Sequence, residues 1–282
     1  EVVLPKGEVV QLGGRTLDTP GYDLTGVFVG SEGTFGIVTK VIARIMRQPE
    51  AVKTLMCVFE SVEEASNTVS EIVARGIIPA AVELMDNLSI QAVEKGVAAG
   101  YPLDAGAVLL VEMDGPKDEV DALVDPINEI CQNNHVREVR VAKDDNERLL
   151  LWKGRKSAFA AMGQLSPDYY VQDTVIPRTR LPQIMEFIGK LSERAGLRVA
   201  NVFHAGDGNL HPLMLYDSRN EGELHEAEEM GAQIIKACIE MGGSLTGEHG
   251  IGVEKRDFMP LMYSDEDLEA MQKVKRGFNP DD

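Results

Sequence analysis

The sequence predicts an α+β fold in which ferredoxin-like strand–helix–strand repeats share a mainly antiparallel sheet. The main observation is that apolar segments of strand length alternate with amphipathic segments of helical spacing, twice in tandem, over residues 53–141. A second observation is that the N-terminal forty-odd residues differ from the rest, because seven glycines crowd residues 13–36. The length of 282 residues allows one large domain or two modest ones.

The glycine-rich N-terminal segment contains two apolar stretches, residues 26–29 and 37–46, which we predict to be strands. The run Arg47-Gln48-Pro49-Glu50 then interrupts the pattern, and we place a domain boundary there. The predicted domains are therefore residues 1–48 and 49–282. Because the chain begins at Glu1 rather than at a methionine, we expect it to be a piece of a longer protein.

The first repeat has a strand over residues 53–59 and a strand over residues 80–85. The helix between them is predicted to begin at a capping box formed by Ser61 and Glu64 and to end before Gly76. The second repeat is predicted to consist of a strand over residues 107–113, a helix over residues 116–131 and a strand over residues 136–141. Such repeats typically pack their helices on one face of the sheet.

Helices and strands continue to alternate after the second repeat. Further helices are predicted over residues 87–97, 144–162, 181–195 and 223–241, and further strands over residues 169–176, 197–203 and 210–215. The helix over residues 181–195 has the clearest apolar spacing of three and four residues. Cys238 falls on the inward face of the last helix, so we interpret it as a core residue rather than a nucleophile.

The composition excludes several classes of function. Asp and Glu total 46 against 28 Lys and Arg, a net charge of −18, and nucleic-acid binding requires a basic surface instead. No apolar run approaches the roughly 20 residues of a membrane-spanning helix, so no integral membrane segment is expected. The three cysteines, Cys57, Cys131 and Cys238, are too far apart for a disulfide framework or a paired-cysteine metal site. These features indicate a soluble protein of the cytoplasm.

Two histidines flank a predicted hairpin loop. Residues 206–209 are four consecutive turn formers between two strands. If they form the loop, His204 lies directly opposite His211, and paired residues project from the same face with Cβ atoms about 4.5–5.5 Å apart. Two imidazoles in that position can bind one metal ion. A histidine pair on a hairpin is more often structural or exposed, and the spacing alone leaves both interpretations open.

A second loop, residues 242–252, contains five glycines around the adjacent residues Glu248 and His249. Glycines allow a ligand or cofactor to approach the backbone closely. Two histidines and one carboxylate form a common set of ligands for a divalent metal, with positions left open for a substrate. His249 then remains as a candidate general base, because imidazoles exchange protons near neutral pH. The alternative interpretation is a flexible loop with polar surface residues.

Arg155 belongs to a third motif, the basic run of residues 151–157 on the helix predicted over residues 144–162. Its guanidinium group, or the neighbouring ammonium group of Lys156, could pair with a substrate carboxylate. From this run alone, a basic patch on an exposed helix face is the more common explanation.

Together these motifs resemble a known family. Residues 30–39, GSEGTFGIVT, are similar to the last segment of the FAD-binding domain in the vanillyl-alcohol-oxidase/PCMH superfamily. Residues 203–212, FHAGDGNLHP, and residues 247–255, GEHGIGVEK, resemble signatures of its FAD-linked oxidase C-terminal domain. That domain occurs in D-lactate dehydrogenases, D-2-hydroxyglutarate dehydrogenases and the D subunit of glycolate oxidase. Residues 77–90, 151–159 and 166–178 look most like the last of these.

For the site, the resemblance implies that His204, His211 and Glu248 are the ligands of a divalent metal, usually zinc. It implies that His249 is the catalytic base and that Arg155 binds the substrate carboxylate. The reaction implied is the oxidation of a small D-2-hydroxy acid to the 2-oxo acid, with hydride passing to N5 of FAD.

For the cofactor, the resemblance implies that Glu32, Gly33, Gly36 and Ile37 lie along the FAD. The earlier part of the flavin domain and its pyrophosphate-binding loop are not in this sequence, so we expect that this chain alone does not retain FAD. The chain has no ligands for an iron–sulfur cluster. Electrons would therefore pass to FAD/iron–sulfur partner subunits, which could also bring the protein to the membrane periphery.

The substrate implied is glycolate or D-lactate. Where 2-hydroxyglutarate dehydrogenases carry a lysine for the distal carboxylate, this sequence has Tyr170, Val171 and Gln172. Two alternatives are kept: a D-2-hydroxyglutarate dehydrogenase, and a non-catalytic module for metal binding or subunit docking.

Overall fold

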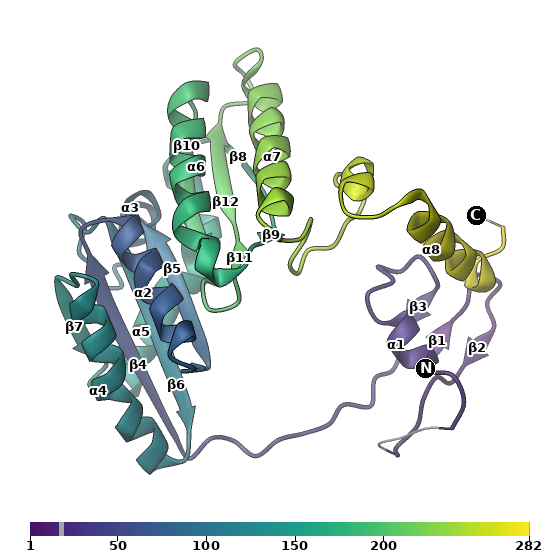
Figure 1. Cartoon of the computed structure of the whole chain (residues 1–282), viewed down its shortest axis with the longest axis horizontal. Coiled ribbons are helices and arrows are strands. Elements are labelled where there is room, and N and C mark those ends of the chain that lie inside the picture. Colours follow the sequence, from purple (N-terminus) through teal and green to yellow (C-terminus); the bar gives the residue numbers. More distant parts are fainter. Residues whose placement is uncertain (17–19, 282) are drawn as a thin grey trace. The chain divides into compact units, whose positions relative to one another are not determined.

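The computed structural model describes residues 1–16 and 20–281, which form two compact units (Figure 1). One unit is Pro49–His249, and the other combines Glu1–Gln48 with Gly250–Asp282. The division after Gln48 falls where the sequence places a boundary. Residues 250–282, however, contact the N-terminal segment, whereas the sequence analysis groups them with residues 49–249. The assignment of each unit to a functional domain stays a prediction. Within the described residues, no helix is long and apolar enough to cross a membrane.

The larger unit is built on a seven-stranded sheet with the order β7-β4-β6-β5-β10-β12-β8, in which every neighbouring pair is antiparallel. The strands are β4 (Ala51–Phe59), β5 (Ala81–Asp86), β6 (Ala107–Gly115), β7 (Glu138–Val141), β8 (Asp168–Val171), β10 (Arg198–Phe203) and β12 (Pro212–Tyr216). The two predicted repeats share this sheet, which confirms the α+β prediction.

The helices of the larger unit cover both faces of the sheet. They are α2 (Val62–Ala74), α3 (Asn87–Gly96), α4 (Lys117–Asn133), α5 (Asp145–Ala161), α6 (Leu181–Ala195) and α7 (Glu223–Glu240). Side chains of α2, α4, α6 and α7 form one core with Cys57 and Phe59 of β4. Side chains of α3 and α5 form a second core with Met56 and Val58 of the same strand. The helices of the two predicted repeats, α2 and α4, lie on one face of the sheet, as expected. The opposite face is also covered, by α3 and α5, because β4 is apolar at consecutive positions, as a strand covered on both faces must be.

The start and end of α2 agree with the sequence. The Ser61 hydroxyl accepts a hydrogen bond from the Glu64 backbone N–H at 3.2 Å, and the Glu64 carboxylate accepts one from the Ser61 N–H at 3.1 Å. Gly76 follows the helix with φ of 74°, the left-handed conformation that ends many helices. Cys238 of α7 is fully buried, as its interpretation as a core residue requires.

The smaller unit contains a three-stranded sheet of β2, β1 and β3. Its elements are β1 (Val2–Val3), β2 (Val9–Val10), α1 (Leu24–Phe28), β3 (Ile37–Val38), a 3₁₀ segment over Arg256–Leu261 and α8 (Asp265–Phe278). The rings of Phe28, Phe35 and Phe278 lie 4.9–6.0 Å apart, centroid to centroid. This aromatic cluster explains why the C-terminal helix packs with the N-terminal segment.

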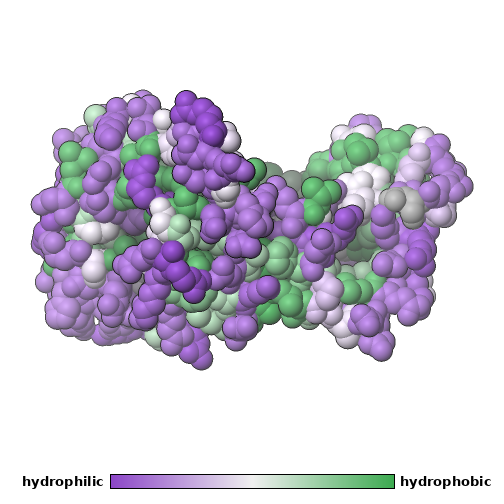
Figure 2. All heavy atoms as spheres, turned by 90° about the horizontal axis from the view of Figure 1, so that it is seen from above, coloured by the Kyte–Doolittle hydropathy of each residue, from purple (hydrophilic) through white to green (hydrophobic). Residues whose placement is uncertain are grey.

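Two predicted strands of the smaller unit were wrong. Residues 26–29 fall largely in α1, where the Asp23 carboxylate caps the helix by accepting from the Gly26 N–H at 2.9 Å. Residues 37–46 form a strand only at Ile37–Val38, because only these pair with β1. Beyond them, Ile45 and Met46 are at least 90% exposed. Figure 2 shows that hydrophobic residues also appear at the surface among hydrophilic ones.

Gly154 of α5 allows a close helix contact and predicts a stability effect. A Cβ atom there would lie 2.7 Å from Ala99 Cβ and from a ring carbon of Tyr101. We expect Gly154→Ala to destabilise the fold by about 1–3 kcal/mol, because neither neighbour has a flexible end that could move away. Gly189 of α6 is the matched control, since its Cβ would meet no atom within 4 Å among the described residues. Gly189→Ala should stabilise by about 0.5–1 kcal/mol, so equal effects in thermal unfolding would contradict this account.

Candidate metal centre

The hairpin that carries the two histidines has a different register from the one predicted. Asn201 of β10 pairs with Pro212 of β12, and His204 forms a bridge with Asn209, so the loop is residues 205–208. His204 therefore lies opposite Asn209 rather than His211, and the predicted pairing was wrong by two residues. A shift of two residues keeps side chains on the same face of a strand. The rings of His204 and His211 still approach to 5.3 Å between centroids.

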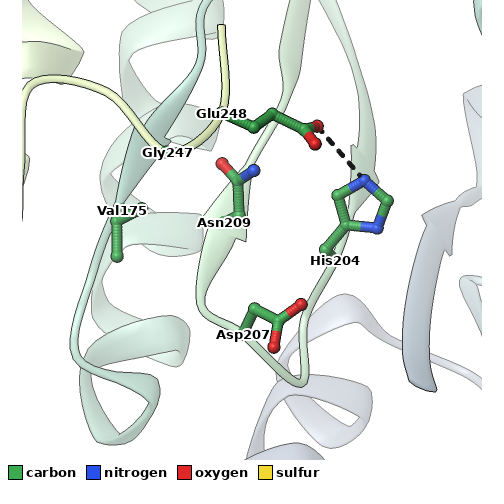
Figure 3. Close-up of a pocket in the computed structure, with 6 residues that line it drawn as sticks. All are labelled: Val175, His204, Asp207, Asn209, Gly247 and Glu248. Carbon is green, nitrogen blue, oxygen red and sulfur yellow. Dashed lines mark ion pairs between the residues drawn. The ribbon is translucent and has the colours of Figure 1, made fainter. Parts of the chain in front are cut away.

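The structure brings the three predicted metal ligands together. The Oε1 atom of Glu248 lies 3.4 Å from His204 Nε2 and 3.2 Å from His211 Nε2. One ligand atom from each residue lies within 4.8 Å of the other two. In Figure 3 the Glu248 carboxylate reaches across the pocket to His204. The pocket is lined by Val175, His204, Asp207, Asn209, Gly247 and Glu248.

The surroundings of His211 fit a metal ligand. Its side chain is 1% exposed, and within the described part of the chain neither ring nitrogen has a hydrogen-bond partner of acceptable geometry. A buried polar atom without such a partner is costly, and a divalent ion beside Nε2 would remove that cost for this atom. Two imidazoles and a carboxylate suit zinc. The residues present therefore fit the metal that the sequence analysis expects.

Behind His204 lies a buried carboxylate that the sequence analysis missed. Glu83 of β5 accepts at Oε1 from His204 Nδ1, 2.9 Å away. Its other oxygen lies 3.0 Å from Nε and 2.7 Å from Nη2 of Arg155. The hydrogen bond to Glu83 raises the pKa of His204 above its usual value, although partial burial opposes the charged form.

Arg155 itself is only 5% exposed, so its interpretation as part of an exposed basic patch was wrong. Its guanidinium group has two contacts with Glu83. Arg155 is not among the residues that line the pocket. Its predicted role in binding a substrate carboxylate stays a prediction.

Asp173 holds the loop that carries Glu248 and His249. Its carboxylate accepts hydrogen bonds from the Thr246 hydroxyl and from the backbone N–H groups of Gly247, Glu248 and His249. Burial alone would raise the pKa of Asp173. The His211 ring and these donors outweigh burial and hold the pKa well below its usual range. Asp173 lies in the stretch of residues 166–178 that carries part of the family resemblance, but its role was missed because its partners are more than 70 positions away.

Asp173, His211 and His249 form a second set of groups close enough to share an ion. The oxygens of Asp173 are already used by the loop donors, which makes this carboxylate a weaker candidate ligand than Glu248. The His249 ring stacks on His211, with centroids 5.0 Å apart, and its Nε2 lies 4.0 Å from Glu248 Oε1. His249 is thus beside the first set and partly exposed, as a base that meets a substrate must be.

Asp173→Asn should destabilise the protein at neutral pH, because an amide cannot accept all of the loop's hydrogen bonds. Each hydrogen bond to a charged group contributes about 1.5–3 kcal/mol. Since the pKa of Asp173 is lowered in the folded state, its stabilisation is complete above the unfolded-state pKa of about 4 and declines as the pH falls below it. The difference in melting temperature between the two proteins should therefore become smaller as the pH falls from 7 to 3. A constant difference would contradict this role.

The four residues predicted to contact FAD lie in the smaller unit. The Glu32 carboxylate accepts hydrogen bonds from the backbone N–H groups of Ile251 and Gly252 at 2.7 and 2.9 Å, so it ties two segments of the unit together. Gly36, with φ of 150°, has no room for a Cβ atom beside the Val3 carbonyl.

The other two predicted FAD residues lie at the surface of the unit. A Cβ atom at Gly33 would meet no described atom within 4 Å, and Ile37 is 63% exposed. The structure explains Glu32 and Gly36 by contacts within the unit, and the role of all four residues in FAD binding stays a prediction.

Comparison with protein families identifies the chain. Residues 48–282 match the model of FAD linked oxidases, C-terminal domain. The chain belongs to this family. The match begins where the sequence predicted a domain boundary and includes all three proposed metal ligands.

Similar proteins agree with this family. The glycolate oxidase subunit GlcD of Escherichia coli (strain K12) is 47% identical over 281 residues, which cover 100% of this chain and 56% of that protein. The D-lactate dehydrogenase [cytochrome], mitochondrial, of Arabidopsis thaliana is 29% identical. The alignment covers 100% of this chain and 50% of that protein. The chain thus spans about half the length of these relatives.

Among solved structures, 4-ethylphenol oxidase from Gulosibacter chungangensis shares the fold. The TM-score is 0.72 at 16% identity, and the alignment covers 99% of this chain and 63% of that chain. Since the identity is low, this likeness concerns the fold alone. It confirms the predicted resemblance at the level of the fold.

Proposed function

We propose that the chain is the substrate-binding part of an FAD-dependent enzyme that oxidises glycolate or D-lactate to the 2-oxo acid. The observation that supports this most is the convergence of His204, His211 and Glu248 in one pocket, with His249 beside them. The relatives named as a glycolate oxidase subunit and a D-lactate dehydrogenase support a small hydroxy acid as substrate.

In this proposal each residue has a defined task. His204, His211 and Glu248 would hold a divalent ion, which supplies Lewis-acid stabilisation of negative charge developing on the hydroxyl oxygen of the substrate. His249 would take the hydroxyl proton at Nε2, the ring atom 4.0 Å from the Glu248 carboxylate. FAD, when bound, supplies a hydride acceptor for the substrate carbon.

The proposed substrate is a small acid with one carboxylate, and the names of the relatives support it. Among the described residues that line the pocket there is no lysine or arginine. Gln172, which the sequence analysis linked to substrate size, is 2% exposed and lies against Gly231 of α7 rather than in the pocket lining. The preference for a small acid therefore rests on the named relatives and not on Gln172. Electron transfer to partner subunits remains part of the proposal.

The test is the substrate profile of the flavin-containing protein that carries this chain. Reduction of the flavin should be fastest with glycolate or D-lactate and at least tenfold slower with D-2-hydroxyglutarate. If D-2-hydroxyglutarate reduced the flavin fastest, the proposed substrate would be wrong and D-2-hydroxyglutarate would take its place. Absence of flavin reduction by all three acids, in protein shown to bind both metal and FAD, would favour a non-catalytic module.

A further inference from the structure

Glu83 connects two groups of the proposed site that the sequence places 49 residues apart, His204 and Arg155. It lies on β5, between β6 and β10 in the sheet, and its side chain is 8% exposed. One carboxylate oxygen faces His204 Nδ1 at 2.9 Å, and the other faces Arg155 at 2.7 and 3.0 Å. A single buried carboxylate is therefore shared between a proposed metal ligand and a buried cation.

The contact with His204 has a consequence for the position of a proton. An ionised carboxylate only accepts hydrogen bonds, so the Nδ1 atom facing it must carry a hydrogen. The Arg155 guanidinium, which only donates hydrogen bonds, faces the other oxygen of the same carboxylate at 2.7 and 3.0 Å. In a neutral imidazole the lone pair then lies on Nε2, the atom that faces Glu248 at 3.4 Å. The arrangement selects the tautomer that can bind a metal on the pocket side.

We propose that Glu83 is a positioning residue for the metal centre, which fixes the tautomer and ring orientation of His204 and holds Arg155 next to it. This inference rests on the proposed metal site. A ligand histidine commonly donates its second ring nitrogen to a carboxylate, and loss of that partner weakens metal binding about 10–100-fold. Glu83 occupies the place of such a partner.

A purely structural ion pair is the competing explanation, because Glu83 and Arg155 are both buried. The two explanations differ for Glu83→Gln. The amide oxygen of glutamine would turn to Arg155, which only donates, and the amide NH₂ would then face His204 Nδ1. This places the imidazole hydrogen on Nε2 and blocks the metal-binding lone pair. If Glu83 and Arg155 form only a structural ion pair, Glu83→Gln should lower the stability of the fold without a selective loss of metal affinity.

The experiment is zinc titration by competition with a chromophoric chelator, using the wild type, Glu83→Gln and Arg155→Lys. Arg155→Lys also disturbs the buried pair, but it keeps a cation beside Glu83 and leaves the carboxylate facing His204. We expect zinc affinity to fall about 10–100-fold in Glu83→Gln and less than threefold in Arg155→Lys, although both lower the melting temperature. Equal affinities in the wild type and Glu83→Gln, or equal losses in both variants, would overturn the inference.

Two further measurements keep the outcome clear. Glu112→Gln is a control for removing a carboxylate from the same sheet, because Glu112 pairs with Arg148 and Trp152 and not with a histidine. It should keep wild-type zinc affinity. If Glu83→Gln does not fold, ¹⁵N NMR of the metal-free wild type, at a pH where the ring is neutral, should show the His204 proton on Nδ1, and a proton on Nε2 would overturn the inference. A wild type that binds no zinc would instead contradict the proposed metal site.

Discussion

Replacing His249 by alanine should lower turnover of the flavin-containing protein on the order of 10²–10⁴-fold, the usual effect of removing a general base. Metal content should stay close to that of the wild type. The reason is positional: His249 lies beside the three ligands, stacked on His211, and none of the three needs it to reach the ion. Steady-state kinetics and metal analysis of the same preparation measure both effects.

Two other outcomes for His249→Ala would each change the mechanism. Loss of the metal would mean that Asp173, His211 and His249 form the true ligand set. Near-normal turnover with intact metal would assign proton removal to another group. In either case the role of His249 as the base would be wrong, but only the first would also move the metal site.

Replacing His204 by alanine should instead remove both metal and activity. Lewis-acid stabilisation by a metal contributes several kcal/mol in the transition state, so its loss should slow turnover at least about a hundredfold. His204 supplies a ligand atom that the remaining pair, His211 and Glu248, cannot replace. The measurement is zinc content after dialysis together with turnover.

His225→Ala is the matched control for this variant. His225 lies on α7, is 71% exposed and contacts only Glu229 among the interactions of the described residues. It should keep both metal and activity. If His204→Ala retained zinc as well as His225→Ala does, the proposed ligand set would be contradicted.

The sheet could be predicted from the sequence because its signals are local. Capping residues such as Ser61, apolar strands and helical spacing each act within a few positions, and they identified both repeats. The face of each helix was harder to predict, since α3 and α5 are assigned to a face only by contacts across the sheet. The prediction of a long N-terminal strand was wrong because strands also depend on partners far away in the sequence. A strand over residues 39–46 would need a partner strand that the described residues do not provide.

The candidate site was partly predictable. The histidines and Glu248 lie in glycine-rich motifs that could be found in the sequence. The predicted register of the hairpin was wrong by two residues, but a shift of two leaves His204 and His211 on the same face. Glu83 and Asp173 were missed because each acts on partners far away in the sequence, His204 at a separation of 121 residues and the 246–249 loop at more than 70. Glu83 and Asp173 lie in two of the stretches that carry the family resemblance, residues 77–90 and 166–178, but neither stretch identifies their partners.

The most direct test of the metal centre is a crystal structure of the zinc-loaded protein with anomalous diffraction data at the zinc absorption edge. We predict one ion bonded to His204 Nε2, His211 Nε2 and a Glu248 carboxylate oxygen, at about 2.0–2.2 Å from each. His204 Nδ1 should remain hydrogen-bonded to Glu83. An ion held by Asp173 and His249, or no ion between the two hairpin histidines at saturating zinc, would contradict the account.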